Sequence, residues 1–211
     1  MRAVIVLGAI TLLTLSAFAD QPAAKPKNPE EEKQALEYLQ MRNIEVSVDS
    51  LHSAAFESNY EDVKHLLMAG VPVDGEGSDT PLVAAMTGCT REGETDLVVD
   101  VVDLLVTRGA DVKRKDDNAN TPLITAAQYC GAKVVNRLIA AGADVNAVNG
   151  SSMTPLMIAL VMGRFDAADA LVAKGAKLNP QQAEVMNNSV SDPRGKAIVA
   201  KATVKAAAKK K

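Results

Sequence analysis

The sequence is poor in aromatic side chains: its 211 residues include no Trp, three Phe and three Tyr. Alanine, valine and leucine must therefore supply most of the core. Side chains this small fill an interior at normal packing density only when the backbone elements lie close together. The composition thus favours a core of small residues between closely packed helices.

Histidine and cysteine are also scarce, with two of each in the chain. His52, His65, Cys89 and Cys130 follow no spacing typical of a metal site or of an activated nucleophile. The glycines form no phosphate-binding motif, and no apolar-flanked pair of carboxylates suggests acid–base chemistry. We therefore expect a protein that is not an enzyme and that takes no cofactor or metal.

The net charge is small, −3 at pH 7, but it is unevenly placed. Residues 201–211 hold five lysines and no acid, so the rest of the chain is distinctly acidic. An acidic body argues against nucleic acid as the main ligand and favours a partner with a basic surface. The lysine tail is interpreted as a solvated end, with contact to anionic lipid or cell-wall polymer as the alternative.

No apolar run reaches the roughly 20 residues that a membrane helix needs. The longest, residues 3–15, follows Arg2 and precedes Ser16-Ala17-Phe18-Ala19. A basic start, a short apolar stretch and an Ala-x-Ala site are typical of a signal peptide. We predict a cleaved signal over residues 1–19. The alternatives are an uncleaved anchor or a buried first helix.

Residues 20–28 are predicted to form a flexible leader, and residues 29–48 to contain an N-terminal cap helix. Asn28 suits the helix N-cap and Pro29 the first helical position. The acids Glu30 to Glu32 then face the positive end of the helix dipole. The helix is expected to end near Arg42.

Repetition at a fixed period dominates the rest of the chain. Thr121 and Thr154 lie 33 residues apart, as do Gly142 and Gly175. The threonine and the proline after it suit a helix start, and the glycine suits the left-handed residue that ends a second helix. Four such units are predicted, the first of them beginning at Asp49 and Ser50 without Thr-Pro.

The period, the Thr-Pro-Leu starts, Ala126-Ala127 and Gly-Ala-Asp-Val-Asn at 142–146 together resemble the ankyrin repeat. The resemblance covers residues 49–179. It implies an all-α solenoid of four helix pairs, with β-hairpin tips between units and a helical cap at each end. The C-terminal cap, residues 180–211, is expected to hold a degenerate helix from Pro180, then a second one running into the lysine tail.

The second unit departs from the pattern, since 41 residues separate Thr80 from Thr121. The surplus of eight falls in residues 89–96, between the two helices. Cys89 and Cys130 each lie nine residues after their threonine, at equivalent places in neighbouring units. An exported chain favours a disulfide between them. Against it, adjacent helices lie about 10 Å apart, whereas a disulfide needs Cα atoms within about 7 Å. Two buried free thiols are the alternative.

The resemblance also implies where a partner binds: at the tips and along the inner face of the first helices. The tip residues in question are Glu76, Asp79, Asp117, Asn118, Asn120, Ser151 and Met153. Those on the first helices are Phe56, Glu57, Thr87, Gln128, Tyr129, Val161 and Met162. Arg91, Glu92 and Glu94 in the insertion form a second candidate patch. The alternatives are that Phe56 and Tyr129 only pack against neighbouring units and that the insertion is merely tolerated.

An exported ankyrin protein of this length resembles the periplasmic self-protection (immunity) proteins with which predatory bacteria inhibit their own cell-wall DD-endopeptidases. The resemblance implies a protein partner of that class in the periplasm, and a chain that is monomeric when free. Ankyrin proteins that support a periplasmic catalase, and a general scaffold, are the alternatives. We expect neither nucleic-acid binding nor stable membrane insertion.

Overall fold

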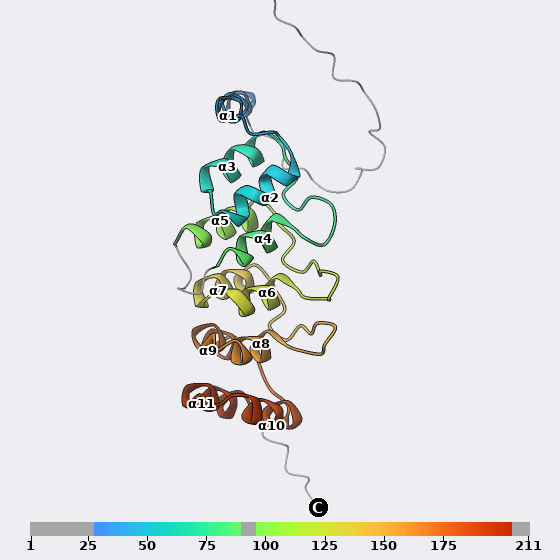
Figure 1. Ribbon diagram of the computed structural model, residues 1–211, viewed down its shortest axis with the longest axis vertical. Coiled ribbons are helices and arrows are strands. Elements are labelled where there is room, and N and C mark those ends of the chain that lie inside the picture. Colours follow the sequence, from blue (N-terminus) through green and yellow to red (C-terminus); the bar gives the residue numbers. More distant parts are fainter. Residues whose placement is uncertain (1–27, 90–95, 204–211) are drawn as a thin grey trace, which may run out of the picture.

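The computed structural model describes residues 28–89 and 96–203, which form a column of stacked α-helices (Figure 1). In chain order the helices are α1 Pro29–Met41, α2 Val48–Phe56, α3 Tyr60–Met68, α4 Pro81–Thr87, α5 Asp96–Thr107, α6 Pro122–Tyr129, α7 Ala132–Ala140, α8 Pro155–Val161, α9 Phe165–Ala173, α10 Pro180–Ser189 and α11 Pro193–Ala202. None of these described helices is long and apolar enough to cross a bilayer.

The helices form two layers. The first helices of the units, α2, α4, α6 and α8, stack on one another and continue into α10. The second helices, α3, α5, α7 and α9, form the other layer, with α1 above α3 and α11 below α9 (Figure 1). Each helix contacts its partner and its neighbours along the column, so the core is continuous although every unit is small.

The repeated Thr-Pro starts cap the first helices as expected. The hydroxyls of Thr80, Thr121 and Thr154 each accept a hydrogen bond from the backbone N–H three residues later. All three threonines are buried, so the cap satisfies a donor that water could not reach. Fully buried leucines in the first turn of each first helix anchor it in the core: Leu51, Leu82, Leu123 and Leu156.

The first unit begins two residues earlier than predicted. Ser47, not Asp49 or Ser50, is the N-cap of α2, and its hydroxyl accepts from the Ser50 N–H. The two additional residues place Val48 against Gly75, where any Cβ would collide with the Val48 side chain. Gly75 also has a positive φ of 63°. The longer helix therefore packs over a connection that is shorter than the later ones.

The connections between units project to one side of the column (Figure 1). We name them tip 1 (residues 71–79), tip 2 (110–120) and tip 3 (143–153). The predicted β-hairpins are wrong in one respect, because none of the described tip residues belongs to a strand. Single backbone hydrogen bonds close tips 2 and 3, from Asp116 to Asn120 (3.0 Å) and from Asn149 to Met153 (3.1 Å).

The two ends of the column are capped differently. At the N-terminal end α1 docks on α3, where the Tyr38 hydroxyl donates to the buried carboxylate of Asp62 (2.9 Å). Arg42 lies 3.3 Å from the same carboxylate, and the Tyr38 ring stacks on His65. Burial, followed by the nearby Asp62 carboxylate, raises the pKa of Tyr38. This end is a single helix held by one polar cluster.

The C-terminal end is a complete helix pair. The predicted degenerate helix from Pro180 is well formed, with a capping box between Asn179 and Gln182. The second helix does not run to the end of the chain, because α11 ends at Ala202. There the chain lies beside the residues that precede α10, and the Leu178 N–H donates to the Ala202 carbonyl (3.0 Å). The lysine tail from residue 204 lies outside the described residues.

Candidate protein-binding surface

Exposed apolar side chains lie at the C-terminal ends of two first helices, α2 and α8, which are separated by α4 and α6 in the column. Phe56 is 53% exposed at the end of α2, and Val161 and Met162 are each 48% exposed at the end of α8. Glu57 and Thr87 are exposed at the corresponding ends of α2 and α4. Large apolar groups held on a rigid scaffold favour burial against a partner.

Gln128 and Tyr129, at the end of α6, are only half-buried members of this row. The Gln128 amide donates to the Tyr129 hydroxyl (3.1 Å), and the Tyr129 ring packs against the core. The alternative that Tyr129 contributes packing therefore holds for much of its surface. Phe56, in contrast, presents more than half of its surface.

A further exposed apolar side chain lies on α10, where none was predicted from the sequence, but it lies outside this row. Val185 is 52% exposed on that helix, which stacks on α8 as α8 stacks on α6. The signal was present in the sequence, because Asn179-Pro180 with Gln182 is a capping-box start. Val185 lies six residues after its N-cap Asn179, as the buried Leu160 does after Thr154, so it is not in register with Val161 and Met162. We name Phe56, Val161 and Met162 the apolar row.

The predicted tip residues divide into exposed and half-buried ones. Glu76, Asp79, Asp117, Asn118 and Ser151 are exposed, whereas Asn120 and Met153 are half-buried. Asp79 lies 3.1 Å from the Nε2 atom of His52 on α2, which ties tip 1 to the first helix behind it. The exposed tip residues are available to a partner, and the half-buried ones hold the tips in place.

Side-chain acceptors link the base of one tip to the next. Both carboxylate oxygens of Asp74 accept from the Asp111 N–H, at 3.0 and 3.2 Å. Burial raises the pKa of Asp74, against the lowering effect of that hydrogen bond and of Arg114. At the equivalent place after tip 3, the Asn146 amide oxygen accepts from the Lys177 N–H (3.3 Å). Lys113 occupies the same position in tip 2, and its ammonium group has no acceptor to offer.

Tips 2 and 3 are linked nearer their ends. The Gly150 N–H donates to the Asn118 carbonyl (2.9 Å), and the Asn149 amide donates to the Asn120 side-chain oxygen (2.8 Å). A Cβ on Gly150 would approach that carbonyl to 3.1 Å, so glycine suits the close contact. The tips therefore form one connected edge and not a set of independent loops.

The two cysteines form a disulfide, Cys89–Cys130. Their Cα atoms lie 5.3 Å apart, well inside the spacing of adjacent helices that argued against the bond. Both residues follow the ends of their helices, and the backbone of Cys130 is extended there, so helix spacing does not limit their approach. The bond joins the second unit to the third. Arg91, Glu92 and Glu94, the second candidate patch, lie outside the described residues.

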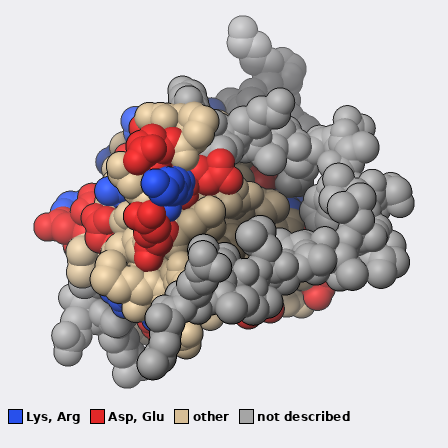
Figure 2. Space-filling model, turned by 90° about the horizontal axis from the view of Figure 1, so that it is seen from above, with Lys and Arg blue, Asp and Glu red and all other residues tan. Residues whose placement is uncertain are grey.

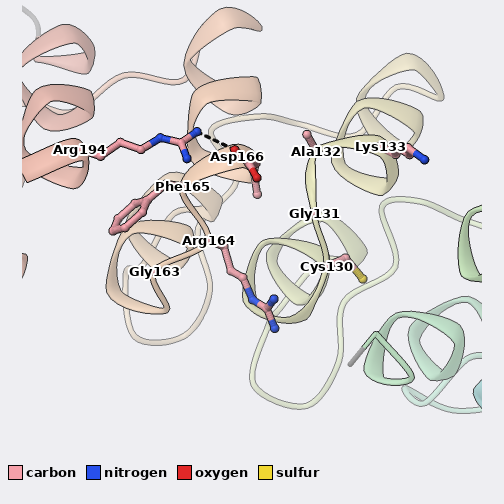
Figure 3. Close-up of a pocket in the computed structure, with 10 residues that line it drawn as sticks. Cys130, Gly131, Ala132, Lys133, Gly163, Arg164, Phe165, Asp166 and Arg194 are labelled. Atoms are coloured by element: carbon pink, nitrogen blue, oxygen red, sulfur yellow. Dashed lines mark hydrogen bonds and ion pairs between the residues drawn. The ribbon is translucent and has the colours of Figure 1, made fainter. Parts of the chain in front are cut away.

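A hollow of about 440 Å³ opens beside this disulfide, between the third and fourth units (Figure 3). Arg194 of α11 reaches across it to Asp166 (2.6 Å) and Asp169 (2.9 Å), and these carboxylates raise the pKa of the Arg194 guanidinium. Phe165 fills the floor, where a Cβ on Gly195 would meet its ring. Two of the charged groups that line the hollow, Arg194 and Asp166, are thus paired with each other, and Lys133 is paired with Asp96 outside it.

Nothing in the described ranges assembles reactive groups. No set of three or more His, Cys, Asp or Glu side chains there could hold a metal ion. His52 and His65 face Asp79 and Glu61, and neither lies beside a nucleophile. What the arrangement offers is a rigid surface with an apolar row and polar tips.

The family model for three successive ankyrin repeats matches residues 51–149 and again residues 94–182. The two matches together span residues 51–182, which is more than half of the 211-residue chain. No curated protein matches the chain. The protein therefore belongs to the ankyrin-repeat family, which typically serves as a protein–protein interaction module without catalytic activity.

Proposed function

We propose that the protein is exported to the bacterial periplasm, where it binds a secreted hydrolase and inhibits it sterically. The observation that carries the binding role is the apolar row, exposed on a rigid helical column at the opposite ends of the first helices from the linked polar tips. The proposed target, a cell-wall DD-endopeptidase, is supported by the resemblance of the N-terminal segment, the four-unit array and the lysine-ended cap to the self-protection proteins.

The inhibition we propose is steric and involves no chemical reaction with the hydrolase. A rigid surface laid over the mouth of a cleft excludes a polymeric substrate by volume alone. The apolar row would supply the buried centre of the interface, and the tips its polar rim. The acidic body would speed association with a basic rim, so added salt should slow binding more than it speeds release.

The partner is tested by capture. Residues 20–211 serve as bait in periplasmic extract of the source organism, and bound proteins are identified by mass spectrometry. We expect an endopeptidase of the penicillin-binding type whose activity disappears in the complex. Recovery of a catalase, or of an endopeptidase that stays active when bound, would contradict the proposal.

The surface is tested separately with the captured partner. Val161→Ser together with Met162→Ser should lower affinity at least about tenfold, because apolar anchors dominate interfaces of this kind. Leu97→Ser is the matched control, since Leu97 is 59% exposed but lies on α5 in the other layer. Equal affinity in all three proteins would place the interface elsewhere. Tyr129 is unsuitable for this test because it also packs in the core.

A further inference from the structure

The N-terminal end of the column holds a vacant helix position. Every other first helix has a first helix stacked above it: α2 lies on α4, α4 on α6, and α6 on α8. Above α3 that place is taken by α1, but no described helix stacks on α2 in the same way. A hollow of about 510 Å³ lies there, which we name the α2 hollow.

The exposed face of α2 keeps the small residues that allow helices to stack. Ser50, Ser53 and Ala54 line the α2 hollow. In α4 the residues at the same places relative to the core leucine are Pro81, Ala84 and Ala85, and all three are buried inside the array. Ser53 is instead exposed. The face is therefore shaped to receive a helix at the close spacing found in the rest of the column.

The rim of the α2 hollow is acidic. Glu45, Asp49 and Glu57 line it and are exposed. Asp62 lies at its base, where Arg42 and Tyr38 already engage it. No Lys or Arg is among the lining residues, although the Arg42 guanidinium stands close by. Figure 2, which looks onto this end of the molecule, shows acidic side chains around a smaller basic patch, with uncharged surface between them.

Apolar side chains border the acidic rim on the side of α1. Leu36, Ile44 and Val46 line an adjoining hollow, with the segment from Asn43 to Glu45 shared between the two. Leu36 and Val46 are both exposed. At the C-terminal end, by contrast, both layers finish with a helix of the cap, the first with α10 and the second with α11. The two ends of the array therefore differ in what they can accept.

We propose that the α2 hollow binds an amphipathic helix of a partner protein. The helix would set small side chains on Ser50, Ser53 and Ala54, and lysines or arginines along its edges would meet Glu45, Asp49 and Glu57. The complementary charge selects a basic helix, and the small residues select one with an alanine-rich face. This site adjoins the apolar row, because Glu57 follows Phe56 directly, but it does not depend on the identity of the hydrolase.

The test uses a fluorescent peptide of about 18 residues, or five helical turns, with an alanine-rich face flanked by lysines. Its anisotropy is measured with the purified protein. Ser53→Tyr, which fills the hollow from an exposed position, should weaken binding about tenfold or more. Glu45→Lys should weaken it about fivefold. Ala140→Tyr and Asp100→Lys, exposed positions on α7 and α5, are the matched controls and should change it less than about twofold.

Three results would overturn the proposal. Equal binding to all four variants would mean that the peptide is attracted only by the overall negative charge. Tighter peptide binding by a Lys25→Glu, Lys27→Glu protein would assign the hollow to the leader of this chain. Self-association in sedimentation that Ser53→Tyr abolishes would assign it to a second copy. Unchanged circular dichroism in each variant confirms that the comparison is between folded proteins.

Discussion

The two edges of the column are held together by different chemistry. Along the tip edge, units are linked by acceptors such as Asp74 and Asn146, which receive backbone N–H groups of the next unit. Along the opposite edge, where first helices turn into second helices, the links are the Cys89–Cys130 disulfide and ion pairs such as Asp96 with Lys133.

The difference shows how neighbouring units can be joined without changing the fold. The tip-edge links give a protein acceptor to backbone N–H groups, those of Asp111 and Lys177, that would otherwise bond to water. The links on the opposite edge are additions: one covalent bond that restrains the unfolded chain, and exposed ion pairs that water and salt weaken. Substitutions on the two edges should therefore differ in size and in their response to reductant, pH and salt.

The largest effect is expected from the disulfide. It joins residues 41 apart in the sequence, and restraint of a loop of that length stabilises the folded state by about 4 kcal/mol. Cys89→Ala with Cys130→Ala should lower the free energy of unfolding in urea by about that amount. Reductant should shift the parent protein to a similar midpoint and leave the double variant unchanged. A reductant effect on the variant would refute this account.

The tip edge is tested next at Asp74. Asp74→Ala leaves the Asp111 N–H without its acceptor and should lower the free energy of unfolding by about 1–3 kcal/mol. Asp74→Asn should retain the hydrogen bond, as Asn146 does at the equivalent place, and is the matched control. If both variants lose the same free energy of unfolding, the charge of the Asp74 carboxylate, and not its role as an acceptor, stabilises the folded state.

The same pair of proteins gives a pH dependence with a definite sign. Because burial raises the pKa of Asp74 in the folded state, the folded protein binds that proton more tightly than the unfolded chain. The stability contributed by Asp74 should fall as pH rises from its ordinary value of 3.8 through the raised pKa. Asp74→Asn lacks this fall, so its stability relative to the parent should increase with pH across that window.

A smaller gain is expected where the tip edge lacks a link. Lys113→Asn places an acceptor where Asp74 and Asn146 have theirs, opposite the Asp144 N–H, and should raise the free energy of unfolding by about 1 kcal/mol. Lys115→Asn removes the same charge two residues away and is the control for electrostatics. A gain that is equal in both variants would trace the effect to charge and not to the new hydrogen bond.

The smallest effect is expected at Asp96. Its hydrogen bond with Lys133 (2.7 Å) lowers the pKa of the Asp96 carboxyl, so the pair stabilises above the ordinary pKa of 3.8 and is lost as pH falls through the lowered one. Both side chains are exposed, and salt screens such pairs. Asp96→Asn should therefore leave the urea midpoint unchanged within error in salt of about 0.15 M. A resolvable loss would show that this ion pair fixes the edge.

The repeated architecture could be predicted from the sequence because each unit carries its own local signals. Thr121-Pro122 caps a helix wherever it occurs, and Gly142, with φ of 95°, ends one. These signals depend only on neighbours within a few residues, so they can be recognised from the sequence alone. The exposed positions Phe56 and Met162 followed from the same register.

Contacts between residues far apart in the sequence were harder to predict. The start of α2 at Ser47 depends on the packing of Val48 over Gly75, which no local pattern announces. The docking of α1 through Tyr38 and Asp62 joins residues 24 apart, and the close approach of Cys89 to Cys130 depends on where two helices end. The helix from Pro180 was predicted only as a degenerate one because the pattern weakens after Asn179, although the fold continues with a regular α10.

The disulfide also limits how far the unfolded chain can be extended. Between Cys89 and Cys130 lie α5, tip 2 and α6, so a bond across them removes 41 residues from the length that the unfolded chain can span. At roughly 3.4 Å per extended residue, that is about 140 Å of contour. A single molecule pulled from its two ends would stop short by that distance when oxidised, and would recover it in one step on reduction.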